Sequence, residues 1–208
     1  FLPTDLIGLA RLGTCPPEPR TLAGIFLAGL SVLAADTRAE GRDLVLRDHS
    51  HGHFCFGSAV PNRPSLRDLL RDNYDLRSLV TVRHPLDSYL SLTRQNWNLY
   101  EPDTLEEYAR RYHLFLDHYE GVEVLRYEDF VADPETRMMR ICEVLNLSYN
   151  PDFQDLFSAQ HLSGDSGRGG DQIALHPRRE VPAAQIAEIA EAPSYDRLCA
   201  RLGYTAEP

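Results

Sequence analysis

Two side chains near the middle of the chain, Arg83 and Ser91, have the chemistry to hold an anion. Arg83 follows an apolar segment, 78–82, and Pro85 then suits the first position of a helix that carries Ser91 about two turns along. The N-terminus of a helix attracts anions, and guanidinium and hydroxyl groups donate hydrogen bonds to phosphate or sulfate. The spacing therefore allows both side chains to converge on one anion. It equally allows an Arg paired with a carboxylate and a Ser that only packs.

The elements that must position these residues alternate between strands and helices. Strands are predicted at 43–47, 78–82 and 122–126, and helices at 21–40, 64–72, 85–97, 104–119 and 134–147. The His-, Gly- and Pro-containing segment 49–62 is predicted as a loop. This alternation indicates an α/β domain with a parallel sheet, whose ligands bind beyond the carboxyl ends of the strands. Those ends lie at Arg47–His51, Arg83–Ser91 and Arg126–Asp129.

The charge balance narrows the class of ligand. The 208-residue chain has a formal net charge of −10, which argues against general binding to nucleic acid. All 21 basic residues are Arg. Any side-chain cation that binds an anion here is therefore a planar guanidinium, which suits phosphate and sulfate.

The cysteine spacing and the apolar segments indicate in which cellular compartment the protein is expected. The four cysteines, Cys15, Cys55, Cys142 and Cys199, show no paired spacing and predict neither a zinc site nor a disulfide framework. A reducing cytoplasm fits this best. The uncharged run 22–35 is shorter than the ~20 residues that cross a bilayer. We expect a buried helix there and no transmembrane segment.

The segment from Arg83 to Ser91 resembles the 3′-phosphate-binding motif of sulfotransferases that use 3′-phosphoadenosine-5′-phosphosulfate (PAPS): an Arg at a strand end, a Pro-containing turn and a Ser eight residues later. The resemblance implies that Arg83 and Ser91 bind the 3′-phosphate. Tyr127-Glu128-Asp129 is similar to a second motif of the family and implies that Tyr127 lies close to the adenine. Packing of Tyr127 in the core is the alternative.

A third similarity is the loop Ser163–Arg168, which resembles a Gly- and Ser-rich loop near the C-terminus of many bacterial members. It implies that Ser166, Gly167 and Arg168 close over the 3′-phosphate, with backbone N–H groups and a guanidinium as donors. The resemblance covers residues 43–205. It implies a P-loop-NTPase-like three-layer fold with a central parallel sheet flanked by helices.

The chain departs from the family at its N-terminus. Members hold the 5′-phosphosulfate on a turn of the Arg-Ser-Gly-Thr-Thr type that leads into a helix. Arg11–Cys15 is only superficially similar, because Pro16 and Pro17 follow where the helix should start. We expect residues 1–208 to form a single domain, with the phosphosulfate loop upstream of Phe1.

The same resemblance suggests the catalytic base. In cytosolic members a His after a strand takes the proton of the acceptor hydroxyl, which implies His49 first and His51 second. Asp48 is an alternative, because other members use Glu or Asp. With His53 these residues form an HxHxH pattern, but no Cys or carboxylate cluster accompanies it, so we expect no metal.

The resemblance thus implies an enzyme that transfers the sulfuryl group of PAPS to a hydroxyl of a carbohydrate, lipid or small metabolite. Its partners would be the nucleotide donor and the acceptor, with a homodimer as a further option. Two alternatives remain. A small-molecule kinase would need a Walker-type Lys, which this chain lacks. A non-catalytic nucleotide-binding or assembly protein could share the fold.

Overall fold

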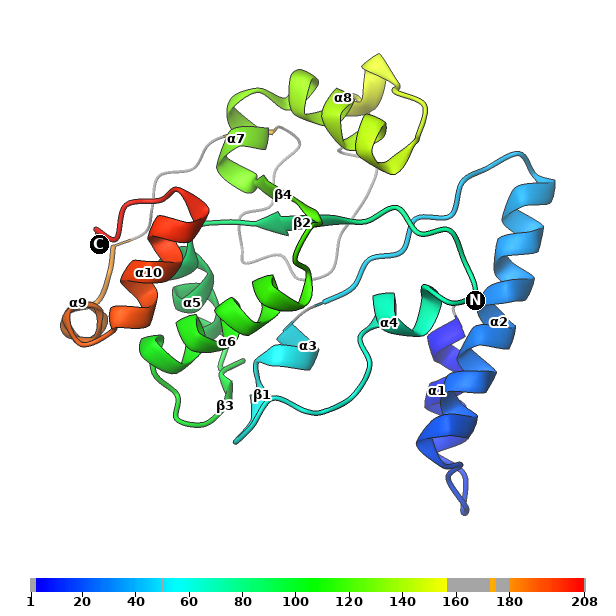
Figure 1. Ribbon diagram of the computed structural model, residues 1–208, viewed down its shortest axis with the longest axis horizontal. Helices are drawn as coiled ribbons and strands as arrows, with labels where there is room; N and C mark the ends of the chain where they lie inside the picture. The colour runs from blue at the N-terminus through cyan, green and yellow to red at the C-terminus, as the bar shows by residue number, and fades with distance from the viewer. Residues whose placement is uncertain (1–2, 50, 157–172, 175–179, 208) are drawn as a thin grey trace. The chain divides into compact units, whose positions relative to one another are not determined.

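The computed structural model describes residues 3–49, 51–156, 173–174 and 180–207 (Figure 1). The chain divides into two compact units. The first comprises residues 1–48 and 63–76, and the second comprises residues 49–62 and 77–208. The single domain expected from the sequence stays a prediction, and each unit is described by itself below.

The first unit is helical. Helix α1 (Pro3–Arg11) and helix α2 (Pro19–Ala39) pack against each other. The short helix α4 (Leu66–Leu70) begins at a capping box, in which the Ser65 hydroxyl accepts the Asp68 N–H and the Asp68 carboxylate accepts the Ser65 N–H. Between α1 and α2 the turn at Arg11–Cys15 does not lead directly into a helix, because α2 starts only at Pro19.

Helix α2 differs from the predicted buried helix. It has 21 residues, of which only Gly29, Leu30 and Thr37 are buried, and Val32 is 70% exposed. The helix extends beyond the uncharged run at both ends, so by length and composition it could cross a membrane. Core helices and signal sequences have the same properties. The predicted absence of a transmembrane segment thus stays a prediction.

The strand predicted at 43–47 is not formed. Residues 42–49 adopt neither helix nor strand, and Leu44, Val45 and Leu46 are exposed. A strand is stabilised by the partner that takes up its backbone hydrogen bonds, so an apolar, β-branched pattern is only a weak local preference. No strand within the described part of the chain pairs with this segment.

The second unit confirms the predicted α/β fold with parallel strands. Strand β2 (Leu79–Val82) pairs in parallel with β4 (Glu123–Arg126), with Val82 opposite Arg126. Strand β1 (Phe56–Gly57) pairs in parallel with β3 (Leu99–Tyr100). The described strands thus form two parallel pairs rather than one continuous central sheet. The segment predicted as a loop at 49–62 contains β1 and the short helix α3 (His51–Phe54).

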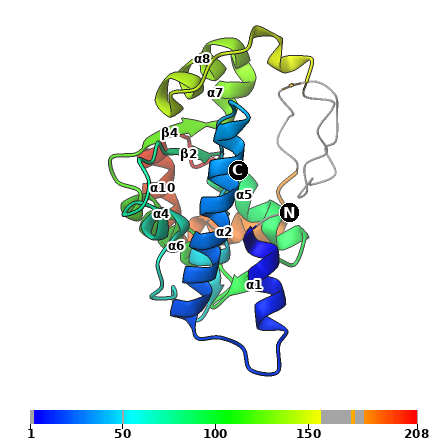
Figure 2. The same ribbon diagram turned by 90° about the vertical axis from the view of Figure 1, so that its right-hand side faces the viewer.

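Helices flank these strands. They are α5 (Pro85–Arg94), α6 (Leu105–His118), α7 (Tyr127–Ala132), α8 (Pro134–Leu145), α9 (Ala183–Ala190) and α10 (Pro193–Leu202), with a 3-10 turn at Pro151–Gln154. In both views α10 runs along α6, and α7 lies beside α8 (Figures 1 and 2). The core is built mainly where α5, α6 and α10 meet, and its fully buried side chains include Leu86, Tyr89, Leu105, Tyr108, Tyr195 and Leu198.

Local signals explain where the helices begin and end. The Thr104 hydroxyl accepts the Glu107 N–H at the start of α6, and the Asp133 carboxylate accepts the Thr136 N–H at the start of α8. Helix α8 ends at Asn146, which adopts a left-handed conformation with φ of 55°. Both predicted starts are confirmed, whereas α5 ends at Arg94, earlier than predicted.

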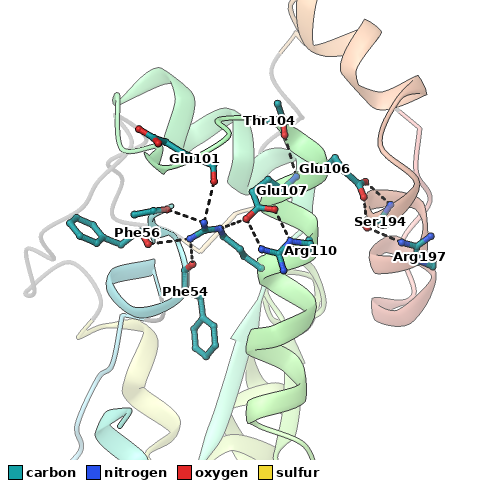
Figure 3. Close-up of polar contacts among 11 residues, drawn as sticks. Phe54, Phe56, Glu101, Thr104, Glu106, Glu107, Arg110, Ser194 and Arg197 are labelled. Carbon is teal, nitrogen blue, oxygen red and sulfur yellow. Dashed lines mark hydrogen bonds and ion pairs between the residues drawn. The ribbon is translucent and has the colours of Figure 1, made fainter. Parts of the chain in front are cut away.

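One buried cation ties α6 to α3, to strand β1 and to the residue that follows β3. Arg111 is completely buried, and all five of its N–H groups are used. Figure 3 labels four of its acceptor residues, Phe54, Phe56, Glu101 and Glu107. Nε donates to the Glu107 carboxylate at 2.7 Å. The other four donate to backbone carbonyls, those of Phe54, Phe56, Gly57 and Glu101, at 2.9–3.4 Å. The sequence analysis did not identify this residue.

Candidate functional site

The carboxyl ends of β2 and β4 lie side by side in the second unit. Because Val82 is opposite Arg126 in a parallel pair, the residues that follow, Arg83 and Tyr127, leave the sheet at the same edge. Ligands of parallel sheets bind at this edge. The pairing therefore brings together two of the residues predicted to hold a nucleotide.

Arg83 points along the first turn of α5. Its Nη2 donates to the backbone carbonyl of Asp87 at 2.5 Å, and its side chain is half-buried. In an α-helix that carbonyl is the usual partner of the N–H four residues on, which belongs to Ser91. The Arg83 guanidinium and Ser91 thus lie within one helical turn of each other.

Both residues keep donors for a ligand. Within the described ranges, the bond to Asp87 is the single hydrogen bond of the Arg83 guanidinium, and the Ser91 hydroxyl has none. The side chain of Ser91 is also half-buried. A multidentate cation and a hydroxyl in a partly desolvated position form a suitable receptor for a phosphate group.

His84 shapes the turn between β2 and α5. The side chain is 5% exposed, and its Nδ1 accepts the N–H of Leu86 at 3.3 Å. Since Nδ1 accepts, the ring proton is assigned to Nε2, which donates to the carbonyl of Thr205 at 2.9 Å. His84 is therefore the neutral N-cap of α5 and also contacts the C-terminal segment.

Tyr127 opens α7 with its side chain 44% exposed. The alternative that this ring fills the core is wrong. An exposed ring at the end of a strand is available for stacking on a planar ligand. Its predicted contact with adenine stays a prediction.

Glu128, the next residue, connects three segments. Its Oε1 accepts the backbone N–H of His84 at 2.9 Å, and its Oε2 accepts the hydroxyl of Tyr204 at 2.6 Å. Arg126 completes the arrangement, since it binds the Asp129 carboxylate through two N–H groups and donates to the carbonyl of Gly203 at 2.9 Å. The sequence analysis singled out the Tyr-Glu-Asp motif but gave Glu128 no role.

Two tyrosine hydroxyls near this edge stay protonated. Burial raises the pKa of Tyr204 above its ordinary value, and the hydrogen bond to Glu128 raises it further. Burial likewise raises the pKa of Tyr112, and the positive charge of Arg83 opposes that shift.

The structure describes the predicted base residues only in part. His49 is exposed and makes no hydrogen bond or ion pair with a described residue. His51 is the first residue of α3, and its side chain lies outside the described part. The half-buried His53 ring packs on Phe54, with 4.6 Å between ring centroids. No described contact joins His49 to Arg83, Ser91 or Tyr127.

The remaining predictions concern a loop and a metal. Ser166, Gly167 and Arg168 lie outside the described residues. Among the described side chains, no group of three or more His, Cys, Asp or Glu could hold a metal ion. The four cysteines are free.

Comparison with known proteins bears on this edge directly. Residues 65–151 match the sequence model of a family described as "Sulfotransferase family". This part of the chain, less than half of its length, is thus similar to the sulfotransferase family. The segment that matches contains β2, Arg83, Ser91, β4 and Tyr127. By contrast, the candidate bases His49 and His51 and the loop residues Ser166–Arg168 lie outside it.

A solved structure of a sulfotransferase domain is also similar. It is the "Sulfotransferase Domain from the Curacin Biosynthetic Pathway", with 15% sequence identity and a TM-score of 0.47 over 98% of this chain and 78% of that chain. At this distance no residue role is carried over from it. A search of curated proteins found no match.

Proposed function

We propose that the chain binds PAPS and transfers its sulfuryl group to a hydroxyl of an acceptor. The observation that carries this proposal is the parallel pairing of β2 with β4. It brings Arg83 and Tyr127 to one sheet edge, with Ser91 one helical turn beyond Asp87, whose carbonyl accepts from Arg83, and all three residues lie in the segment that matches the sulfotransferase family.

The proposed nucleotide contacts follow from the donors at this edge. Arg83 and Ser91 bind the 3′-phosphate, because among the described residues the Arg83 guanidinium makes one hydrogen bond and the Ser91 hydroxyl makes none, which leaves donors for an anion. The exposed ring of Tyr127 stacks on the adenine. Ser166, Gly167 and Arg168 add donors to the same phosphate.

The proposed chemistry is an in-line displacement at sulfur. The acceptor oxygen forms a bond to sulfur as the bond between sulfur and the bridging phosphate oxygen breaks, which releases adenosine 3′,5′-bisphosphate. A base takes the acceptor proton, and His49 is the first candidate and His51 the second. Guanidinium and backbone N–H groups can balance the charge on the departing oxygen, so the reaction needs no metal.

The test is calorimetric titration of adenosine 3′,5′-bisphosphate into the chain, with adenosine 5′-monophosphate as the comparison ligand. We expect micromolar binding that falls at least about tenfold without the 3′-phosphate and in Arg83→Ala, since one charged hydrogen bond contributes about that much. The matched control is Arg94→Ala, which removes an exposed Arg from the same helix. Equal affinity for the two nucleotides, or no binding by a folded chain that also carries the segment expected upstream of Phe1, would contradict the proposal and favour a non-catalytic protein of the same fold.

A further inference from the structure

The carboxylate of Glu128 continues the link between β2 and β4 past the end of their ladder. The last paired residues are Val82 and Arg126. Two residues beyond each of these, at His84 and Glu128, the strands have already turned into other elements. The hydrogen bond from His84 N–H to Glu128 Oε1 joins the two segments there at 2.9 Å.

That hydrogen bond sits between the proposed ligand residues. His84 directly follows Arg83, and Glu128 directly follows Tyr127. Pro85 has no N–H, so the His84 N–H is the last donor before α5 begins. Movement of either turn would therefore change the distance between the Arg83 guanidinium and the Tyr127 ring.

The C-terminal segment holds Glu128 in place. The hydroxyl of Tyr204 donates to Oε2 at 2.6 Å, so both carboxylate oxygens are bound. The ring of Tyr204 packs between its neighbours, with 4.9 Å to the His84 ring and 5.4 Å to the Arg126 guanidinium carbon. The segment itself is fixed by Arg126 at Gly203 O and by His84 at Thr205 O.

We infer that Glu128 is a positioning residue for nucleotide binding: through His84 N–H and Tyr204 OH it sets the separation of Arg83 and Tyr127. The inference rests on the proposed function. Glu128 acts through hydrogen-bond geometry, because its two oxygens are directed at protein donors that lie 44 and 76 residues away in sequence. Its role is thus distinct from that of Arg83, which supplies charge to the ligand.

Two substitutions separate geometry from charge. Glu128→Ala removes both hydrogen bonds. Glu128→Gln keeps an oxygen for the His84 N–H and offers an NH₂ group to the Tyr204 hydroxyl, which can accept as well as donate. A role in geometry therefore predicts that Gln rescues what Ala loses. Tyr204→Phe removes one bond and keeps the ring, and Glu143→Ala, on the exposed face of α8, is the control.

Two measurements are made on each variant: hydrogen exchange of the His84 amide by NMR, and calorimetric affinity for adenosine 3′,5′-bisphosphate. We expect Glu128→Ala to speed the exchange and weaken the affinity by about tenfold each, with Glu128→Gln and Glu143→Ala close to the wild type. Tyr204→Phe should weaken the affinity by about threefold, and it decides the matter if Glu128→Ala does not fold.

The outcomes distinguish the inference from the function on which it rests. Faster exchange of the His84 amide with unchanged affinity would overturn the positioning role and leave the nucleotide site standing. A Gln variant as weak as the Ala variant would show that charge matters and would also overturn it. If the wild type binds no nucleotide, the proposed function fails first, and this inference falls with it.

Discussion

Arg111 and Glu107 form a buried ion pair on one face of α6, with 2.7 Å between Nε and Oε1. The Arg111 side chain is fully enclosed, yet every N–H group finds an acceptor, four of them backbone carbonyls from the region of β1 and β3. Glu107 is also bound by two N–H groups of Arg110. Strands β1 and β3 pair over only two residues each, so their own backbone hydrogen bonds give little stability. The hydrogen bonds of Arg111 fix this short pair to α6.

Replacement of Arg111 should destabilise the second unit strongly. Arg111→Met leaves four buried carbonyls without donors and part of the Glu107 charge uncompensated, so we expect a loss of about 3–5 kcal/mol in the free energy of unfolding. Urea unfolding followed by circular dichroism measures this. Arg110→Ala is the matched control, because the Arg110 side chain is 51% exposed and its removal should cost about 1 kcal/mol or less. Equal stability of the two variants would contradict the structural role of Arg111.

Glu107 should make the free energy of unfolding depend on pH under acidic conditions. The hydrogen bond from Arg110 lowers the pKa of Glu107 most, and that from Arg111 adds to this against the opposing effect of burial. A carboxyl with a depressed folded-state pKa stabilises the fold above its unfolded pKa, near 4.5, and that stability is lost as pH falls through the folded value. The stability advantage of the wild type over Glu107→Gln should therefore be constant from pH 7 to about 5 and shrink below 4.5. An advantage that persists at pH 3 would argue against a lowered pKa.

Tyr127 and Arg83 should affect different parts of the ligand. If Tyr127 stacks on adenine, Tyr127→Ala weakens adenosine 3′,5′-bisphosphate and adenosine 5′-monophosphate alike, by about tenfold. Arg83→Ala should weaken only the ligand with the 3′-phosphate. Because the Tyr127 side chain is 44% exposed, its loss should leave the thermal midpoint nearly unchanged. A Tyr127→Ala variant that discriminates between the two nucleotides would assign the ring to the phosphate side instead.

The identity of the catalytic base is tested by measuring kcat and nucleotide affinity separately for each variant. Release of adenosine 3′,5′-bisphosphate from PAPS is followed with a panel of sugar, phenol and alkyl alcohol acceptors. If His49 is the base, His49→Gln should lower kcat by about 10²–10⁴-fold with unchanged nucleotide affinity. His51→Gln and Asp48→Asn test the two alternatives in the same assay. A full rate in His49→Gln together with a loss in either of the others would move the role to that residue.

Much of the proposed site could be predicted from local sequence. Segments 78–82 and 122–126 are short, apolar at their centres and followed by helix starts, which is enough to predict two parallel strands and the edge where Arg83 and Tyr127 leave them. The starts of α6 and α8 were also predictable, because capping side chains act within three residues of the helix they begin.

Other features depended on partners that are far away in the chain. The apolar pattern at 43–47 predicts a strand, but a strand forms only where another strand accepts its hydrogen bonds. The apolar run in α2 indicates a helix, whereas its exposure is a matter of packing. The links made by Arg111 and Glu128 join residues 10 to 76 positions apart. Sequence alone determined the local elements and the ligand-type side chains, because propensity and capping act over a few residues. The tertiary structure decided which buried polar groups meet, because each such group must find a partner that only the folded chain brings near.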